Sequence, residues 1–242
     1  MSCPRFIAHR GAGTCAPENT MAAFELGAAL GHTAFECDVK LSADDVCVLL
    51  HDDTLERTTN GQGAAGAMRW ADLRQLDAGT WLSPDFAGEP LASLADIARL
   101  CCPKGYFVNL EIKPSPGTDT HTAHLVANAA AALWAGQHTQ LLLSSFSHVA
   151  LQAARAAQPQ LARAHLFKTL PPDWLDLAQD VACQGVVLHH SLVSPHTIAA
   201  CHAQGLWCAS YTVNDPEQAQ RFIGWGLDHL ITDAVKTFKN PT

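Results

Sequence analysis

The stretch Ala34-Phe35-Glu36-Cys37-Asp38-Val39 decides how the chain is interpreted, because it joins a nearly continuous apolar run to two carboxylates spaced two residues apart. Other short apolar segments recur at residues 6–8, 46–50, 107–112, 141–144, 185–188, 207–211 and 229–232, with a weaker one at 162–166. Such runs are typical of parallel strands that are covered on both faces. We therefore expect a parallel sheet with helices packed on its outside.

Helical patterns with readable ends lie between these strands. A helix is expected after Asn19-Thr20, ending near Leu30 before Gly31, because Asn and Thr cap helix starts and Gly follows helix ends. Asn19 is equally suited to capping this helix and to lining a site. Further helices are expected from Ser147 to about Pro159, from Ser194 to Gly205 and from Asp215 to about Gly224. This alternation predicts a closed α/β fold, the TIM (β/α)8 barrel.

Residues 54–104 interrupt the alternation. They contain several glycines and the aromatic residues Trp70, Trp81 and Phe86, but no clear strand. We interpret this interval as a small insertion after an early strand, lying over one barrel face and holding only short helices such as 93–100. No repeat or low-complexity linker is visible, so residues 1–242 are interpreted as a single domain.

The composition of the chain excludes several classes of protein. With 242 residues, 48% apolar and 16% charged, the chain is expected to form a sizeable core. The net charge of -8 and the lack of a basic run argue against nucleic acid and anionic membranes as partners. No secretory or membrane-spanning stretch is found, which predicts a cytoplasmic protein without membrane insertion. Nine cysteines without a Cys-x-x-Cys pair indicate reduced thiols.

Three carboxylates are expected to meet at the barrel mouth. Glu36 and Asp38 share one strand face, while Cys37 between them faces the helices. The same spacing places Glu111 and Lys113 on one face of a second strand. Carboxylates without clustered Cys or His ligands suit magnesium, calcium or manganese better than zinc. Glu36, Asp38 and Glu111 are therefore the candidate metal ligands.

Two histidines end apolar runs beside charged residues. His9 precedes Arg10 and a glycine-rich turn, and His51 follows the run 46–50. A pair of imidazoles can deprotonate a nucleophile and protonate a leaving alkoxide, while guanidinium and ammonium groups offset charge on phosphoryl oxygens. This inventory indicates a metal-assisted phosphoester hydrolase with a small-molecule substrate. The candidate phosphate-binding and substrate-binding residues are Arg10, Lys113, Glu18 and Tyr211.

Eight ordered segments of the chain resemble the glycerophosphodiester phosphodiesterase family, particularly its small cytosolic bacterial type. They are residues 8–11, 17–20, 35–39, 51–59, 76–81, 109–113, 211–214 and 231–233. Each segment alone is weak, but the ordered set spans nearly the whole chain and is specific. The chain departs from the family pattern at Cys37, where a bulkier apolar residue is common, and at Tyr211, where tryptophan is frequent.

The resemblance implies a TIM barrel with a short insertion and a defined set of site residues. His9 and His51 would be the acid-base pair, Glu36, Asp38 and Glu111 would hold a divalent cation, and Arg10 and Lys113 would contact phosphate. The family cleaves deacylated phospholipid head groups, such as glycerophosphocholine or glycerophosphoethanolamine, to glycerol 3-phosphate and an alcohol.

Two other functions are compatible with parts of this pattern. A barrel phospholipase acting on intact lipids would need an exposed apolar or basic surface at the mouth, which the acidic composition does not favour. A non-catalytic phosphoester-binding barrel would be expected to lack a histidine or a metal carboxylate, and none is missing. The sequence leaves open which histidine is the base, whether water or a glycerol hydroxyl attacks, and the metal, the head group and the oligomeric state.

Overall fold

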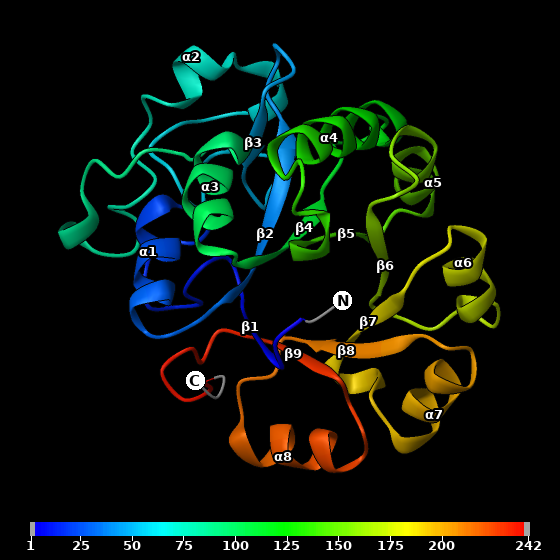
Figure 1. Ribbon diagram of the computed structural model, residues 1–242. Helices are drawn as coiled ribbons and strands as arrows, with labels where there is room; N and C mark the ends of the chain where they lie inside the picture. Colours follow the sequence, from blue (N-terminus) through cyan, green and yellow to red (C-terminus); the bar gives the residue numbers. More distant parts are fainter. Residues whose placement is uncertain (1–2, 240–242) are drawn as a thin grey trace.

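The computed structural model describes residues 3–239, and its strands lie close to the expected positions (Figure 1). They are β1 (Phe6–Ala8), β2 (Ala34–Leu41), β3 (Cys47–Leu49), β4 (Phe107–Ile112), β5 (Leu141–Ser145), β6 (Ala162–Phe167), β7 (Gly185–His189), β8 (Trp207–Tyr211) and β9 (His229–Thr232). The weakest expected strand is present as β6. Its pattern is weak because Arg163 and His165, which alternate with apolar residues, are both buried.

Eight of these strands close into a parallel barrel, as predicted. The order around the barrel is β1-β9-β8-β7-β6-β5-β4-β2, and β1 pairs with β2 to complete the ring, with Ala8 opposite Phe35. The exception is β3, which runs antiparallel to β2 with Val39 opposite Leu49. The run 46–50 therefore forms a hairpin with β2 and returns the chain to the rim, where the amide of Leu50 donates to the carbonyl of Asp38.

Helices surround the barrel (Figure 1). They are α1 (Met21–Ala29), α2 (Trp70–Leu73), α3 (Leu94–Cys101), α4 (Asp119–Leu133), α5 (His148–Ala157), α6 (Trp174–Asp180), α7 (Pro195–Ala203) and α8 (Pro216–Gly224), with short 3-10 turns η1 (Ala65–Ala67), η2 (Pro84–Phe86), η3 (Cys102–Lys104), η4 (His138–Gln140) and η5 (His190–Leu192). The expected caps at Ser147, Ser194 and Asp215 are confirmed. The cap of α1 is Thr20, whose hydroxyl accepts from the amide of Ala23, so Asn19 is left for another role.

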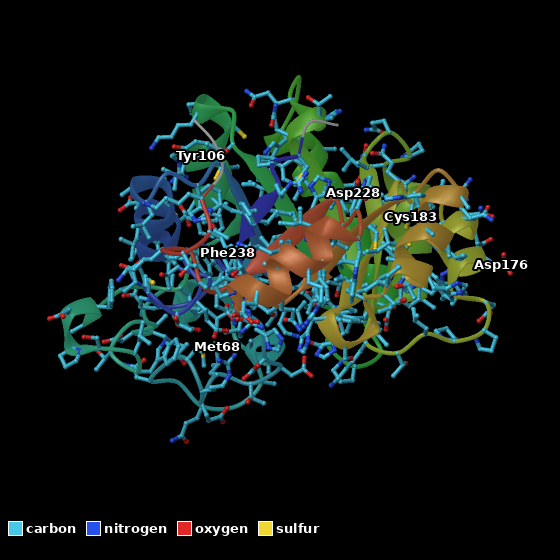
Figure 2. The ribbon with its side chains drawn as sticks, turned by 90° about the horizontal axis from the view of Figure 1, so that it is seen from below. Met68, Tyr106, Asp176, Cys183, Asp228 and Phe238 are labelled. Carbon is cyan, nitrogen blue, oxygen red and sulfur yellow. The ribbon has the colours of Figure 1, made fainter. Side chains whose placement is uncertain are left out.

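Between β3 and β4, the residues that the structure describes form no further strand. The first part of this segment, around Met68, lies to one side of the barrel (Figure 2). It packs on β3 through its own apolar cluster, which includes Leu55, Leu73 and Leu91. The helix expected at 93–100 is α3, capped by Ser93 and placed in the helix ring between α1 and α4 (Figure 1). This segment therefore both packs beside the barrel, against β3, and supplies the helix α3 to its wall.

The apolar core lies in two layers. The interior of the barrel is filled by residues from several strands, including Ile7, Phe107, Leu142 and Ile231. Larger clusters fill the space between the sheet and the helices. Within residues 3–239, every helix is too short or too polar to serve as a membrane span. The packed interior leaves one rim of the barrel for polar side chains.

Candidate active site

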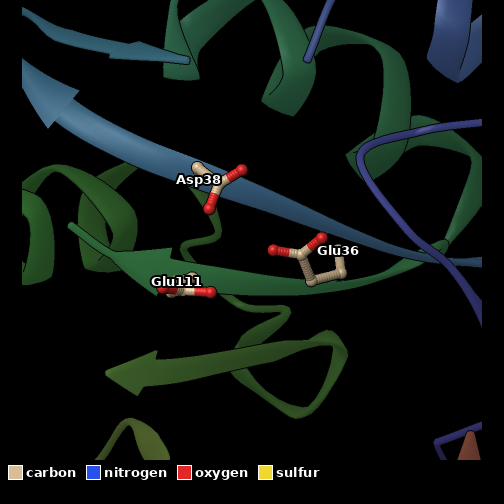
Figure 3. A group of neighbouring side chains, drawn as sticks. All are labelled: Glu36, Asp38 and Glu111. Atoms are coloured by element: carbon tan, nitrogen blue, oxygen red, sulfur yellow. The ribbon is translucent and has the colours of Figure 1, made fainter. Parts of the chain in front are cut away.

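Three carboxylates converge at the rim, as the strand spacing predicted. Glu36 and Asp38 come from β2 and Glu111 comes from β4, where Asp38 lies directly opposite Glu111 in the parallel register. One carboxylate oxygen from each residue lies within 4.8 Å of the other two. Figure 3 shows all three side chains on the same face of these two strands. The pairing of β2 with β4 therefore brings together residues that are 73 to 75 positions apart in sequence.

The three carboxylates differ in charge state because their partners differ. Burial, followed by the charge of Asp38, raises the pKa values of Glu36 and Glu111 above their usual range. Burial also acts to raise the pKa of Asp38, but the charges of Arg10 and Lys113 outweigh it and lower that pKa. Lys113 Nζ lies 3.1 Å from Glu111 and 3.7 Å from Asp38. In the absence of a bound cation, Asp38 is therefore ionised, whereas Glu36 and Glu111 favour the protonated form.

Asn19 holds Asp38 in place. Its amide nitrogen donates to Asp38 Oδ2 at 2.9 Å, and its Oδ1 accepts from the Asp38 backbone amide at 3.1 Å. Asn19 has a φ of 61° and Arg10 a φ of 50°, both in the left-handed region. Such backbone is costly for residues other than glycine and is concentrated at functional sites. The sequence-based alternative of a helix cap for Asn19 was wrong, because Thr20 occupies that position.

His9 is fixed by a carboxylate that the sequence analysis did not select. Its Nδ1 lies 2.6 Å from Oδ1 of Asp233, and its Nε2 lies 3.7 Å from Glu36. Burial would lower the pKa of His9, but the hydrogen bond to Asp233 and the charge of Glu36 raise it overall. Gly13 permits this approach, since a Cβ there would lie 2.1 Å from the carbonyl oxygen of Asp233. The only sequence signal for Asp233 is its place in the resembling segment 231–233.

His51 is held by a series of ion pairs that leads back to Arg10. Its Nδ1 lies 2.6 Å from Asp52, which also accepts from Arg57 at 2.6 Å. Arg57 donates to both oxygens of Glu18 at 2.8 Å, and Glu18 accepts from Arg10 at 2.7 Å. Burial lowers the pKa of His51 overall, despite the nearby charge of Asp38. The candidate Glu18 therefore binds two arginines of the site.

Arg10 and Lys113 flank the carboxylates, and Tyr211 lies across the rim. The backbone amide of Arg10 donates to Glu36 at 3.1 Å, while its Nε lies 3.1 Å from Asp38. Lys113 Nζ lies 5.9 Å from the ring centroid of Phe146, which contacts Tyr211 edge to face at 5.7 Å. The Tyr211 hydroxyl donates to the carbonyl of Phe167 at 3.4 Å. Tyr211 therefore forms part of an aromatic wall rather than part of the charged cluster.

A cavity of about 310 Å³ adjoins His9 and Arg10. Its lining includes Thr14, Glu18, Arg57, Trp81 and Leu82. The indole nitrogen of Trp81 donates to the carbonyl of Ala78 at 2.8 Å, so the rest of the ring supplies an apolar surface. Trp81 therefore forms part of the wall of this cavity.

A closed α/β barrel with carboxylates, imidazoles and cations gathered at one rim defines the class of this protein as a barrel enzyme for phosphoesters. The glycerophosphoryl diester phosphodiesterase family matches the chain over residues 9–237, and the chain belongs to that family. It is therefore a hydrolase of phosphodiesters.

Individual relatives agree with this assignment. A glycerophosphodiester phosphodiesterase of Caldanaerobacter subterraneus subsp. tengcongensis is 30% identical over 239 residues, which cover 97% of this chain and 96% of that protein. An Oleispira antarctica phosphodiesterase, solved with its product sn-glycerol-3-phosphate, superposes with a TM-score of 0.90 at 33% identity, covering 97% of this chain and 95% of that one. The Agrobacterium tumefaciens glycerophosphodiester phosphodiesterase gives 0.79 at 27% identity, covering 97% and 98%.

Proposed function

We propose that this protein hydrolyses glycerophosphodiesters, such as glycerophosphocholine or glycerophosphoethanolamine, to glycerol 3-phosphate and an alcohol with the aid of a divalent cation. The single observation that carries the proposal is the meeting of Glu36, Asp38 and Glu111 beside His9 and Arg10, with His51 near enough to interact electrostatically with Asp38. The product bound to the Oleispira antarctica relative supports a substrate of the same chemical class.

The residues present fit a hard divalent cation. Oε1 of Glu36 is buried and has no hydrogen-bond partner among the described residues, which is costly unless another group binds it. The donor set is made of oxygen only, because Cys37 packs in the outer apolar cluster. Glu36, Asp38 and Glu111 would hold magnesium or calcium, with manganese as a further candidate. A bound cation would supply charge stabilisation at the phosphoryl oxygens.

His9 and His51 are proposed to move protons on opposite sides of the bound phosphodiester. Each offers Nδ1 to an aspartate, His9 to Asp233 and His51 to Asp52, so each carries its proton on Nδ1 when neutral. Nε2 is then the atom of each ring that can accept or release a proton. One imidazole would take the proton of the nucleophile, and the other would protonate the departing alkoxide.

The cations of the site would bind the phosphate. Arg10 is held by Glu18 at Nη1, and Lys113 is held by Glu111, so both side chains are positioned beside the carboxylates. A planar guanidinium fits phosphate oxygens, and an ammonium adds a point charge. Both groups would offset the negative charge that develops on the phosphoryl oxygens. Tyr211 is proposed to form part of the pocket wall for the substrate.

The proposal is tested by a coupled assay for glycerol 3-phosphate on a panel of glycerophosphodiesters, with and without chelator. We expect the parent to be active, chelation to abolish the activity and magnesium or calcium to restore it. His9→Ala should collapse turnover, whereas Glu25→Gln, an exposed carboxylate on α1, should leave it unchanged. Activity in chelator or in His9→Ala would contradict the mechanism. Turnover of intact lipid alone would favour a phospholipase, and binding without turnover a non-catalytic barrel.

A further inference from the structure

Arg57 joins two loops of the site by two bidentate ion pairs. Its Nε and Nη2 donate to the two oxygens of Asp52 at 2.6 and 3.1 Å. Its Nη1 and Nη2 donate to the two oxygens of Glu18 at 2.8 Å each. Paired arginine-carboxylate bonds of this kind define orientation as well as distance. One side chain thus sets the relative position of the loop after β1 and the loop after β3.

Both partners of Arg57 pass their position on to a group that faces the proposed reaction. Asp52 binds Nδ1 of His51 at 2.6 Å, and Glu18 binds Nη1 of Arg10 at 2.7 Å. Arg57 is therefore one residue removed from a candidate acid-base group and also one residue removed from a candidate phosphate-binding group. No other described residue bonds to both Glu18 and Asp52 among residues 3–239.

The hydrogen bonds of Arg57 distinguish its role from that of Arg10. Arg57 uses four of the five N–H groups of a guanidinium in its bonds to Asp52 and Glu18. Nη2 of Arg10, by contrast, forms no hydrogen bond within the described part of the chain. The Arg57 side chain is 43% exposed, whereas that of Glu18 is 13% exposed. Arg57 covers the carboxylates from the solvent side and has little capacity left for a substrate.

We propose that Arg57 is a positioning residue for the phosphodiesterase reaction, which holds His51 and Arg10 in one common geometry through Asp52 and Glu18. The inference rests on the proposed function, because it concerns the same reaction. Without Arg57, Asp52 loses two donors and Glu18 loses two donors, so both side chains regain rotamer freedom. Misplacing an acid-base group by a small distance lowers the rate of the chemical step more than it weakens substrate binding.

The test compares Arg57→Ala and Arg57→Lys with Arg69→Ala. Arg69 is a matched control, since it lies in the same segment and pairs with a single carboxylate, Asp44, at 3.6 Å. We expect Arg57→Ala to lower kcat by about 10- to 100-fold, as for other groups that orient site residues, with KM changed by less than about threefold. Arg57→Lys should also have a lowered kcat, because an ammonium group cannot form the two bidentate ion pairs with Asp52 and Glu18. Arg69→Ala should match the parent.

Chemical rescue separates positioning from folding. Guanidinium chloride, added well below its denaturing range, should restore part of kcat in Arg57→Ala, whereas sodium chloride at equal ionic strength should not. Melting temperature is measured in parallel. Unchanged kcat in Arg57→Ala, a change confined to KM, or a loss that tracks melting temperature and resists rescue would each overturn the inference. An inactive parent would instead overturn the proposed function, so the two failures are distinguishable.

Discussion

The rim of the barrel is divided into two sectors of opposite character. The charged sector, formed by β1, β2, β4 and β9, carries Glu36, Asp38, Glu111, His9 and Asp233. The aromatic sector, formed by β5 to β8, carries Phe146, His189 and Tyr211. The ring of Tyr211 contacts that of Phe146 at a centroid distance of 5.7 Å and that of His189 at 5.5 Å. The same strand geometry thus supports dense charge on one side and ring packing on the other.

The segments that connect the strands also differ between the two sectors. The aromatic sector is linked through α5, α6 and α7, in regular alternation with the strands. The charged sector contains the left-handed residues Arg10 and Asn19, the antiparallel β3 and the long segment before β4. Like charges and strained backbone lower stability, and natural proteins concentrate both where chemistry needs them. We infer that the regular sector mainly stabilises the barrel, while the irregular sector holds the residues proposed to carry out the reaction.

The largest effect is expected from the charged sector. Glu36→Gln removes one candidate metal ligand without changing side-chain size. It should lower kcat/KM by about 1,000-fold, because a bound cation would contribute several kcal/mol to stabilising the charge of the transition state. Isothermal titration with magnesium or calcium should show weakened binding in parallel. Retained activity with full metal affinity would remove Glu36 from the site.

The same variant should be more stable than the parent in chelator. Burial and Asp38 raise the pKa of Glu36 to about 8, so the folded protein holds a proton that the unfolded chain has released between pH 4.5 and 8. The contribution of Glu36 to stability is therefore present at low pH and is lost as pH rises through 8. The gain in free energy of unfolding of Glu36→Gln should be greatest above pH 8, as measured by urea denaturation.

The opposite pH dependence is expected from His165 on β6, behind the aromatic sector. Burial lowers its pKa to about 4, so the unfolded chain binds the proton first between pH 6.5 and 4. Stability should rise with pH across this window, and up to about 3 kcal/mol should be lost as pH falls through it. In the parent, the ring of His165 stacks on Phe167 at 4.2 Å, and His165→Phe keeps an aromatic ring there. This variant should lose less free energy of unfolding between pH 6.5 and 4 than the parent. An equal loss in both proteins would show that His165 does not cause it.

Two histidine-aspartate pairs allow a direct comparison of the sectors. His9 pairs with Asp233 at 2.6 Å at the rim, and His148 pairs with Asp180 at 3.0 Å on the outside of the barrel. Asp233→Asn should lower kcat by about 10- to 100-fold with little change in KM, because a group that orients a site residue has effects of that size. Asp180→Asn should leave kcat unchanged. Equal effects of the two variants in steady-state assays would contradict a special role for Asp233.

The smallest effect is expected at the cavity beside His9. Trp81→Ala removes the apolar wall supplied by the segment before β4, and it should change KM by about three- to tenfold, as for the loss of roughly 1 kcal/mol of contact. The change should differ among choline, ethanolamine and glycerol head groups if the alcohol lies there. Trp225→Ala, a similarly exposed tryptophan outside the cavity, is the control. Identical KM values for both variants would exclude Trp81 from substrate contact.

The sequence by itself determined the barrel and most of the candidate site. Strands covered on both faces need nearly continuous apolar runs, so their positions can be read from where such runs occur in the sequence. The side-chain period of two places Glu36 with Asp38, and the ends of parallel strands meet at one rim. These rules are local or follow from topology, so they also predicted that Glu111 would join the cluster.

Only the tertiary structure decided which side chains hold these residues in place. The support of His9 by Asp233 joins positions 224 residues apart, and the bonds of Arg57 to Glu18 span 39 residues. Hydrogen-bond partners across loops leave no periodic pattern in the sequence, because they depend on the angles at which separate segments approach. The role of Asn19 was undecided for the same reason, since its contact with Asp38 exists only once α1 and β2 have packed.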